Sequence, residues 1–118
     1  LINAAGDRKI VTFGRSGNAD CQIIDYKPLD WYKAEVSGVL KGKKWKTVMP
    51  TVGRHLALNV AAALLAATEA GADLEAAAEA ISRTQLPPMR MEIRSWKGGT
   101  LVMDNYNSNP PAVEFALE

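Results

Sequence analysis

Hydrophobic and polar positions follow two different periods along the chain, and each period predicts a different kind of element. Across residues 53–71, G-R-H-L-A-L-N-V-A-A-A-L-L-A-A-T-E-A-G, apolar residues recur every three or four positions, as in a buried helix. Alanine, which has the highest helix propensity, occurs around the whole helix and indicates close packing on several sides. Gly71 suits the left-handed position that commonly ends a helix. We expect the rest of the chain to be arranged around this helix.

Short strand-like runs precede the central helix. They are rich in β-branched residues or alternate polar and apolar positions, and they are bounded by glycine, proline or polar turn residues: 9–14, 20–27, 32–41 and 44–49. The last two runs flank Gly42-Lys43, which predicts a β-hairpin with one exposed face. We expect Trp45 and Val48 to belong to this sheet. The sheet is predicted to be a scaffold, because loops carry function more often than paired strands do.

A second helix follows the central one. Asp73 is a candidate N-cap for a helix over residues 74–83, which is acidic at its start and basic at its end, as the helix dipole favours. Its inner face is predicted to consist of apolar residues at helical spacing: Leu74, Ala77, Ala78 and Ile81. Two prolines break the pattern within residues 84–88, and we interpret this stretch as the boundary between two domains, 1–87 and 88–118.

The last part of the chain predicts another hairpin. Residues 91–97 and 100–105 flank Gly98-Gly99, a strong signal for a two-residue turn. The second strand runs into D-N-Y-N-S-N-P-P, where Ser108 or Asn109 can cap a third helix with proline in its first turn.

The composition excludes several classes of function. The net charge is +1, so there is no electrostatic case for binding nucleic acid or an anionic membrane surface. The single cysteine, Cys21, excludes an internal disulfide framework and a cysteine-based zinc site, and favours a reducing, cytoplasmic compartment. The single histidine, His55, excludes a cluster of histidine ligands around a metal. No apolar stretch reaches the ~18 residues of a membrane helix.

Both ends of the sequence look cut. The chain begins without an initiator methionine or the pattern of a signal peptide, and it stops within a helical pattern, F-A-L-E. A sheet without its earlier strands would expose strand edges and apolar surface, so we expect the chain either to self-associate or to adopt a partly rearranged fold.

The start of the central helix carries two candidate binding residues. His55 and Asn59 are four positions apart and share one face of the helix. An asparagine amide offers donors and acceptors that suit the edge of adenine, and free amides at a helix start favour a nearby anion. The alternative is that His55 caps the helix and that Asn59 bonds a neighbouring loop.

Two charged residues in the last part of the chain are further candidates. Arg90 follows L-P-P-M, and its guanidinium could pair with phosphate oxygens; the alternative is an ordinary salt bridge. Asp104 ends an apolar strand, where a carboxylate could hold a ribose diol; the alternative is an Asx-turn that supports Tyr106 and Asn107. No phosphate-binding loop of the G-x-x-x-x-G-K-[ST] type and no Ser-His-Asp set occurs in the sequence.

These segments together resemble the Mur ligase family. The matching motifs are G-R-H-L-A-L-N-V-A-A-A at 53–63, P-M-R at 88–90 and D-N-Y-N-S-N-P at 104–110, with V-T-F-G at 11–14 followed by Ala19-Asp20. The resemblance covers nearly the whole chain in the same order. It implies an α/β fold: the end of the central ATP-binding domain, joined to the first hairpin and helix of a Rossmann-like C-terminal domain.

The resemblance also implies an activity. Members of the family use ATP to activate a substrate carboxylate as an acyl phosphate, which an amine then attacks to form an amide. Y-N-S-N-P is most similar to the branch that joins D-alanyl-D-alanine to UDP-N-acetylmuramoyl-tripeptide in peptidoglycan synthesis. By this likeness Asn59 would contact adenine with His55 beside it, Arg90 would meet nucleotide phosphate or ribose, and Asp104 would hold the ribose. Tyr106 and Asn107 would line the same cleft.

The sequence departs from the family pattern at two points. Leu56 stands where the family usually has an asparagine directly after the histidine, which removes one expected contact. The phosphate loop, the Mg²⁺ ligands and the carbamylated lysine of the family are absent, so no catalytic residue and no metal ligand is assigned within this chain. We therefore predict that the chain alone does not catalyse ligation. The competing interpretations are a non-catalytic α/β interaction module and a related ligase of the folylpolyglutamate or cyanophycin type.

Overall fold

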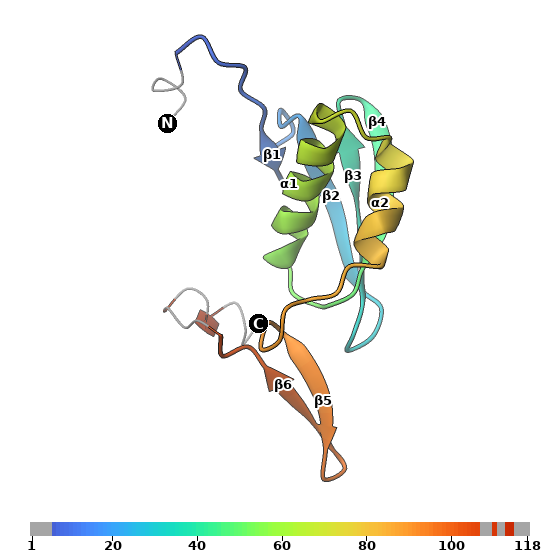
Figure 1. Ribbon diagram of the computed structural model, residues 1–118, viewed down its shortest axis with the longest axis vertical. Coiled ribbons are helices and arrows are strands. Elements are labelled where there is room, and N and C mark those ends of the chain that lie inside the picture. The colour runs from blue at the N-terminus through green and yellow to red at the C-terminus, as the bar shows by residue number, and fades with distance from the viewer. Residues whose placement is uncertain (1–5, 107–109, 111–112, 115–118) are drawn as a thin grey trace.

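A computed structural model describes residues 6–106, 110, 113 and 114. Its elements, in chain order, are β1 (Phe13–Gly14), β2 (Cys21–Pro28), β3 (Ala34–Leu40), β4 (Lys43–Met49), α1 (Leu56–Glu69), α2 (Leu74–Ser82), β5 (Glu92–Trp96) and β6 (Gly99–Met103). The molecule is elongated, with extents of 55 × 31 × 22 Å. Both helices pack on one face of the first sheet, and the hairpin β5–β6 extends away from it (Figure 1).

The first sheet has the order β1-β2-β3-β4. β1 pairs with β2 in parallel, whereas β2–β3 and β3–β4 are antiparallel. The register between β2 and β3 shifts between Ile23 and Asp25, where a bulge bends the strand. The fold is therefore a mixed α/β arrangement with a four-stranded mixed sheet, which confirms the α/β class at this coarse level.

The strand expected over residues 9–14 is wrong over most of its length. Only Phe13 and Gly14 pair with β2, and the side chain of Phe13 is 48% exposed instead of buried. The backbone N–H of Thr12 donates instead to Asp20 Oδ2 at 2.8 Å, so a side chain takes the place of a ladder partner. The expected strand over 20–27 and the hairpin that follows it are confirmed to within one to two residues.

The core lies between the first sheet and the two helices. The largest side chains that are fully buried are Leu64 of α1, Val36 of β3 and Cys21 of β2. Trp45 and the alanines Ala57 and Ala61 are also buried, so the alanine-rich surface of α1 lets the helix approach the sheet closely. The predicted inner face of α2 is confirmed: Ala78 is buried, and Leu74, Ala77 and Ile81 pack against the core.

The ends of both helices follow the sequence signals closely. Gly71 has a φ of 96°. The N–H of Gly71 donates to Thr68 O and that of Ala72 donates to Ala67 O, which is the Schellman pattern. The Asp73 side chain accepts bonds from the N–H groups of Glu75 and Ala76, so the predicted N-cap of α2 is confirmed. The third helix predicted from Ser108 or Asn109 lies largely outside the described residues.

No helix within the described residues is long and apolar enough to cross a membrane.

Candidate functional site

The chain between β4 and α1 forms the first wall of the candidate site. Thr51 is 4% exposed, and Gly53 adopts a φ of 120° that side chains rarely tolerate. The Gly53 N–H donates to the Tyr26 hydroxyl at 2.7 Å, which ties this loop to β2. α1 then begins at Leu56, whose N–H donates to Gly53 O. His55 occupies the N-cap position of α1, as the alternative interpretation expects, but its side chain makes no capping hydrogen bond.

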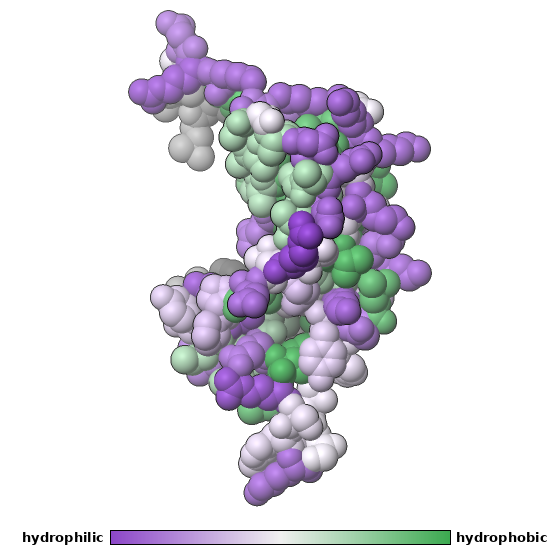
Figure 2. Space-filling view, turned by 45° about the vertical axis from the view of Figure 1, so that its right-hand side comes forward, coloured by the Kyte–Doolittle hydropathy of each residue, from purple (hydrophilic) through white to green (hydrophobic). Residues whose placement is uncertain are grey.

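Two adjoining hollows lie around this loop. The first, which we call the helix hollow, has a volume of about 220 Å³ and an almost wholly apolar lining, with Asn59 as its amide group. The second, the hinge hollow, has a volume of about 260 Å³ and is lined by Tyr32, Arg90 and Glu92 among others. Pro50, Thr51 and Leu86 line both hollows. The surface in Figure 2 is indented between the part that carries the helices and the part that carries the hairpin.

The structure thus brings two of the predicted site residues, Asn59 and Arg90, to neighbouring hollows although they are far apart in sequence. His55 is half-buried at the start of α1 and lines neither hollow. A larger hollow of about 470 Å³ lies between β4 and α2, and none of the predicted site residues lines it. The volume of the hollows alone would therefore place the binding site between β4 and α2, whereas the sequence motifs place it at the two smaller hollows.

Arg90, Asp104 and Tyr106 meet at the base of the hairpin β5–β6. The Arg90 guanidinium lies over the Tyr106 ring, 4.5 Å from its centroid. Asp104 Oδ1 accepts the N–H of Met91 at 3.1 Å, and the Tyr106 N–H donates to Met89 O at 3.2 Å. Asp104 thus bonds to the backbone just before β5, across the base of the hairpin. Asn107 lies outside the described residues.

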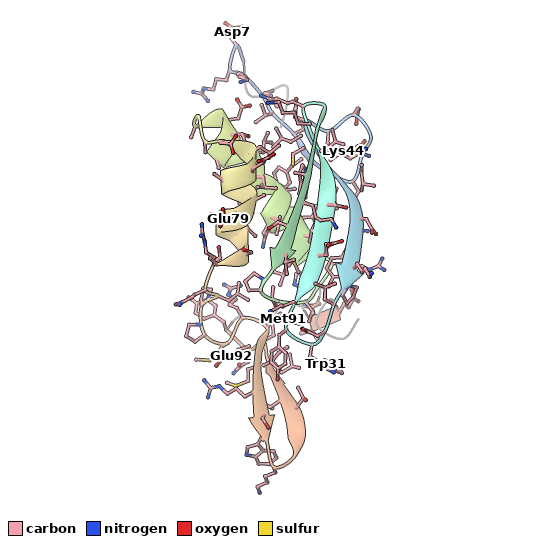
Figure 3. All side chains as sticks on the ribbon, turned by 90° about the vertical axis from the view of Figure 1, so that its right-hand side faces the viewer. Asp7, Trp31, Lys44, Glu79, Met91 and Glu92 are labelled. Atoms are coloured by element: carbon pink, nitrogen blue, oxygen red, sulfur yellow. The ribbon has the colours of Figure 1, made fainter. Side chains whose placement is uncertain are left out.

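Glu92 is a residue of this region that sequence reasoning missed. Its Oε2 accepts the Met89 N–H at 3.0 Å, and its Oε1 accepts a bond from Arg94 Nε at 2.7 Å. These two interactions, the backbone bond first, lower the pKa of the Glu92 carboxyl below its ordinary value, so the carboxylate persists to lower pH than in a free glutamate. Met91 and Glu92 lie where the linker from α2 meets β5 (Figure 3). The sequence signal that could have pointed to Glu92 was its position two residues after Arg90.

Among the described residues no group of three or more His, Cys, Asp or Glu side chains could hold a metal ion. The chemistry available at the two hollows is recognition: an amide, apolar walls, and an arginine stacked on an aromatic ring. Such a set can hold an aromatic base and an anionic group, and it contains no nucleophile paired with a base.

No protein-family model matches the chain. It is 36% identical over 112 residues to the UDP-N-acetylmuramate--L-alanine ligase of Paenarthrobacter aurescens, a match that covers 95% of this chain and 24% of that protein. The chain matches a segment of the Mur ligases. It spans about a quarter of the length of the relatives it matches, and those relatives are the ATP-dependent amide ligases expected from the motifs.

Solved Mur ligase structures share the fold. One is the UDP-N-acetylmuramoylalanyl-D-glutamyl-2,6-diaminopimelate--D-alanyl-D-alanyl ligase of Acinetobacter baumannii, with a TM-score of 0.84, 22% identity, and coverage of 97% of this chain and 25% of that one. Another is the MurF ligase of Thermotoga maritima in complex with ADP, with a TM-score of 0.76, 20% identity, and coverage of 91% of this chain and 24% of that one. The sequence comparison names an L-alanine ligase, whereas the structural comparison names a D-alanyl-D-alanyl ligase. The two comparisons therefore agree on the Mur ligases as a family and differ on the member.

Proposed function

We propose that this chain is the nucleotide-facing part of an ATP-dependent Mur ligase that makes peptidoglycan precursors in the cytoplasm. The observation that carries the proposal is the pair of adjoining hollows, because they set the Asn59 amide and the Arg90 guanidinium on two sides of Thr51 and Leu86. The helix hollow fits a flat apolar base with one polar edge, and the hinge hollow offers a cation for phosphate.

The proposal assigns the two parts of the chain to two domains. Residues 1–87 would be the end of the central ATP-binding domain, and residues 88–118 the start of the C-terminal domain. The two sheets of the described residues share no strand pairing, and the Pro87-Pro88 linker joins them, which supports a boundary there. ATP supplies the phosphoryl group that activates the carboxylate, with Mg²⁺ ligands expected from a part of the ligase that precedes this chain. Residues of the two parts would close on the nucleotide and exclude water.

The amine acceptor we propose is D-alanyl-D-alanine, with UDP-N-acetylmuramoyl-tripeptide as the other substrate. D-N-Y-N-S-N-P at 104–110 and the likeness of fold to a D-alanyl-D-alanyl ligase support this acceptor. A second candidate is L-alanine joined to UDP-N-acetylmuramate, which the 36% identity to the Paenarthrobacter aurescens ligase favours.

The test compares both substrate pairs on the natural polypeptide that contains this chain. ATP is supplied with each pair, and phosphate release and the mass of the product are measured. Amide formation with D-alanyl-D-alanine alone supports the first candidate, and amide formation with L-alanine alone supports the second. If neither substrate pair gives ATP-dependent phosphate release and an amide product, the proposal is overturned.

A variant pair tests the nucleotide site itself. Asn59→Ala removes the amide from the helix hollow, and we expect ADP affinity to fall about tenfold or more because a buried base edge loses its partner. Asn18→Ala, an exposed asparagine in the turn before β2, is the matched control and should bind ADP as the unmodified protein does. Equal affinity in both variants would argue against the adenine assignment.

A further inference from the structure

Two residues with side chains adopt left-handed backbone on either side of Arg90. Met89 has a φ of 59° and Met91 a φ of 49°. In this region the Cβ atom crowds the following carbonyl oxygen, so residues other than glycine avoid it. A pair of such residues around a single arginine persists only when neighbouring groups hold it.

The structure shows the groups that hold this backbone. Glu92 Oε2 accepts the Met89 N–H at 3.0 Å, and Asp104 Oδ1 accepts the Met91 N–H at 3.1 Å. The Tyr106 N–H donates to Met89 O at 3.2 Å, so Met89 is bonded at both its N–H and its carbonyl. Bonds from a backbone N–H to an ionised carboxylate are stronger than neutral ones, so the Glu92 carboxylate holds Met89 more firmly than a neutral acceptor would.

The held backbone determines where the Arg90 side chain goes. Arg90 lines the hinge hollow and lies over the Tyr106 ring, 4.5 Å from the centroid. Were Met89 to relax to the right-handed or extended region, the chain direction at Arg90 would turn and its guanidinium would leave this position. The Glu92 carboxylate also lines the hinge hollow, but its two oxygens are taken by Met89 and Arg94.

We propose that Glu92 is a positioning residue for nucleotide binding, which holds Met89 left-handed so that Arg90 faces the phosphate groups of a nucleotide in the hinge hollow. This inference rests on the function proposed above. It assigns Glu92 no contact with the nucleotide, because a carboxylate beside phosphate would repel it.

ADP binding to the natural polypeptide, measured by calorimetry, tests the role of Glu92. Glu92→Ala should lower the affinity about tenfold, equivalent to about 1.4 kcal/mol. Glu92→Gln should stay within about twofold of the unmodified protein, because its amide oxygen accepts the same N–H. Arg94→Gln is the matched control: it removes the other partner of Glu92 and leaves the Met89 bond, so affinity should not change.

A rescue separates positioning from any other role of Glu92. Glycine adopts positive φ without strain, so adding Met89→Gly to Glu92→Ala should return the affinity to within about threefold of the unmodified protein. Exchange of the Met89 amide hydrogen should be faster in Glu92→Ala than in the unmodified protein, a readout that does not depend on nucleotide.

Four outcomes bear on the inference. Unchanged ADP affinity in Glu92→Ala overturns it, and so does a Glu92→Ala loss that Met89→Gly fails to restore. If the unmodified protein binds no ADP, the proposed function fails and this inference with it. If Asn59→Ala weakens binding while Glu92→Ala does not, the proposed function stands and only the role of Glu92 is lost.

Discussion

Cys21 shows how burial controls chemistry at a single residue. Its side chain is fully buried in β2, and burial raises the pKa of the thiol from 9.0 to about 11. At neutral pH only a small fraction of Cys21 is therefore in the reactive thiolate form, and burial keeps reagents away from it.

We expect a maleimide at pH 8 to label native Cys21 only as fast as the protein unfolds, and to label it at once in denaturant. The measurement is the time course of the mass increase. Labelling of the native protein at the denatured rate would show that this part of the sheet opens readily.

The candidate site illustrates what sequence spacing can and cannot predict. Asn59 and Arg90 were predicted because their residue types match the chemistry of a nucleotide, and the structure sets them at neighbouring hollows. Thr51 and Glu92 were missed, because which residues line the hollows depends on backbone conformation. Residue spacing does not indicate that Met89 and Met91 adopt left-handed backbone. Without that conformation, the sequence offers no reason to single out the carboxylate two positions after Arg90.

At the scale of elements, both hairpins were predicted and both turns were displaced by one residue. The turns are Lys41-Gly42 and Lys97-Gly98, in place of the predicted Gly42-Lys43 and Gly98-Gly99. All four turn residues have positive φ, between 47° and 83°, as a type I′ turn requires. Glycine takes the second position and lysine tolerates the first, so a prediction that starts the turn at glycine places it one residue too late.

The approach of β3 to its two neighbours depends on the absence of a side chain at Gly38. A Cβ atom there would lie 1.9 Å from Gln22 O and 2.7 Å from Trp45 Cζ2, and backbone cannot move aside easily. Gly38→Ala should therefore lower the free energy of unfolding by about 3 kcal/mol, at the upper end of overpacking costs.

Gly17→Ala is the control for this substitution, because the nearest atom to its Cβ is 3.9 Å away. Denaturant titration of both variants checks the prediction. Similar stabilities would mean that the sheet adjusts at Gly38 without cost.

Helix α1 offers a second matched pair on one element. Leu64 is fully buried, whereas Leu58 is 38% exposed. Leu64→Ala should cost about 2–5 kcal/mol of unfolding free energy, and Leu58→Ala much less, because only the first leaves a cavity in the core. Thermal unfolding of the two variants measures the difference, and equal losses would indicate that α1 is not held against the sheet as described.

At the scale of the whole molecule, Glu69 joins three separate parts of the chain. It is the last residue of α1 and pairs with Lys41 in the β3–β4 turn and with Lys9 ahead of β1. The bonds from Lys41 and then Lys9 lower the pKa of Glu69 below 4.5, and the bond to Glu69 raises the pKa of Lys9 above 10.5.

These shifts set the pH range over which Glu69 contributes to stability. A carboxyl with a lowered folded pKa stabilises the protein above its unfolded pKa, and the contribution is lost as pH falls through the folded value. Glu69→Gln should therefore melt slightly below the unmodified protein at pH 7, and the gap should close as the pH falls below about 4.5. A gap that is the same at pH 3 and pH 7 would show that charge at Glu69 is not its cause.

The three tryptophans are distributed so that each part of the molecule carries its own. Trp45 is 5% exposed in the core of the first sheet, whereas Trp31 is 67% exposed in the β2–β3 loop and Trp96 is 61% exposed at the tip of the second hairpin. Iodide should quench two of the three emissions and leave a blue-shifted remainder from Trp45. With one tryptophan kept at a time, fluorescence would report separately on the core, on the loop whose Tyr32 lines the hinge hollow, and on the hairpin that carries Glu92. Trp31 and Trp96 are thus natural optical probes for the two parts of the chain that nucleotide binding is expected to bring together, and Trp45 is an internal reference in the core.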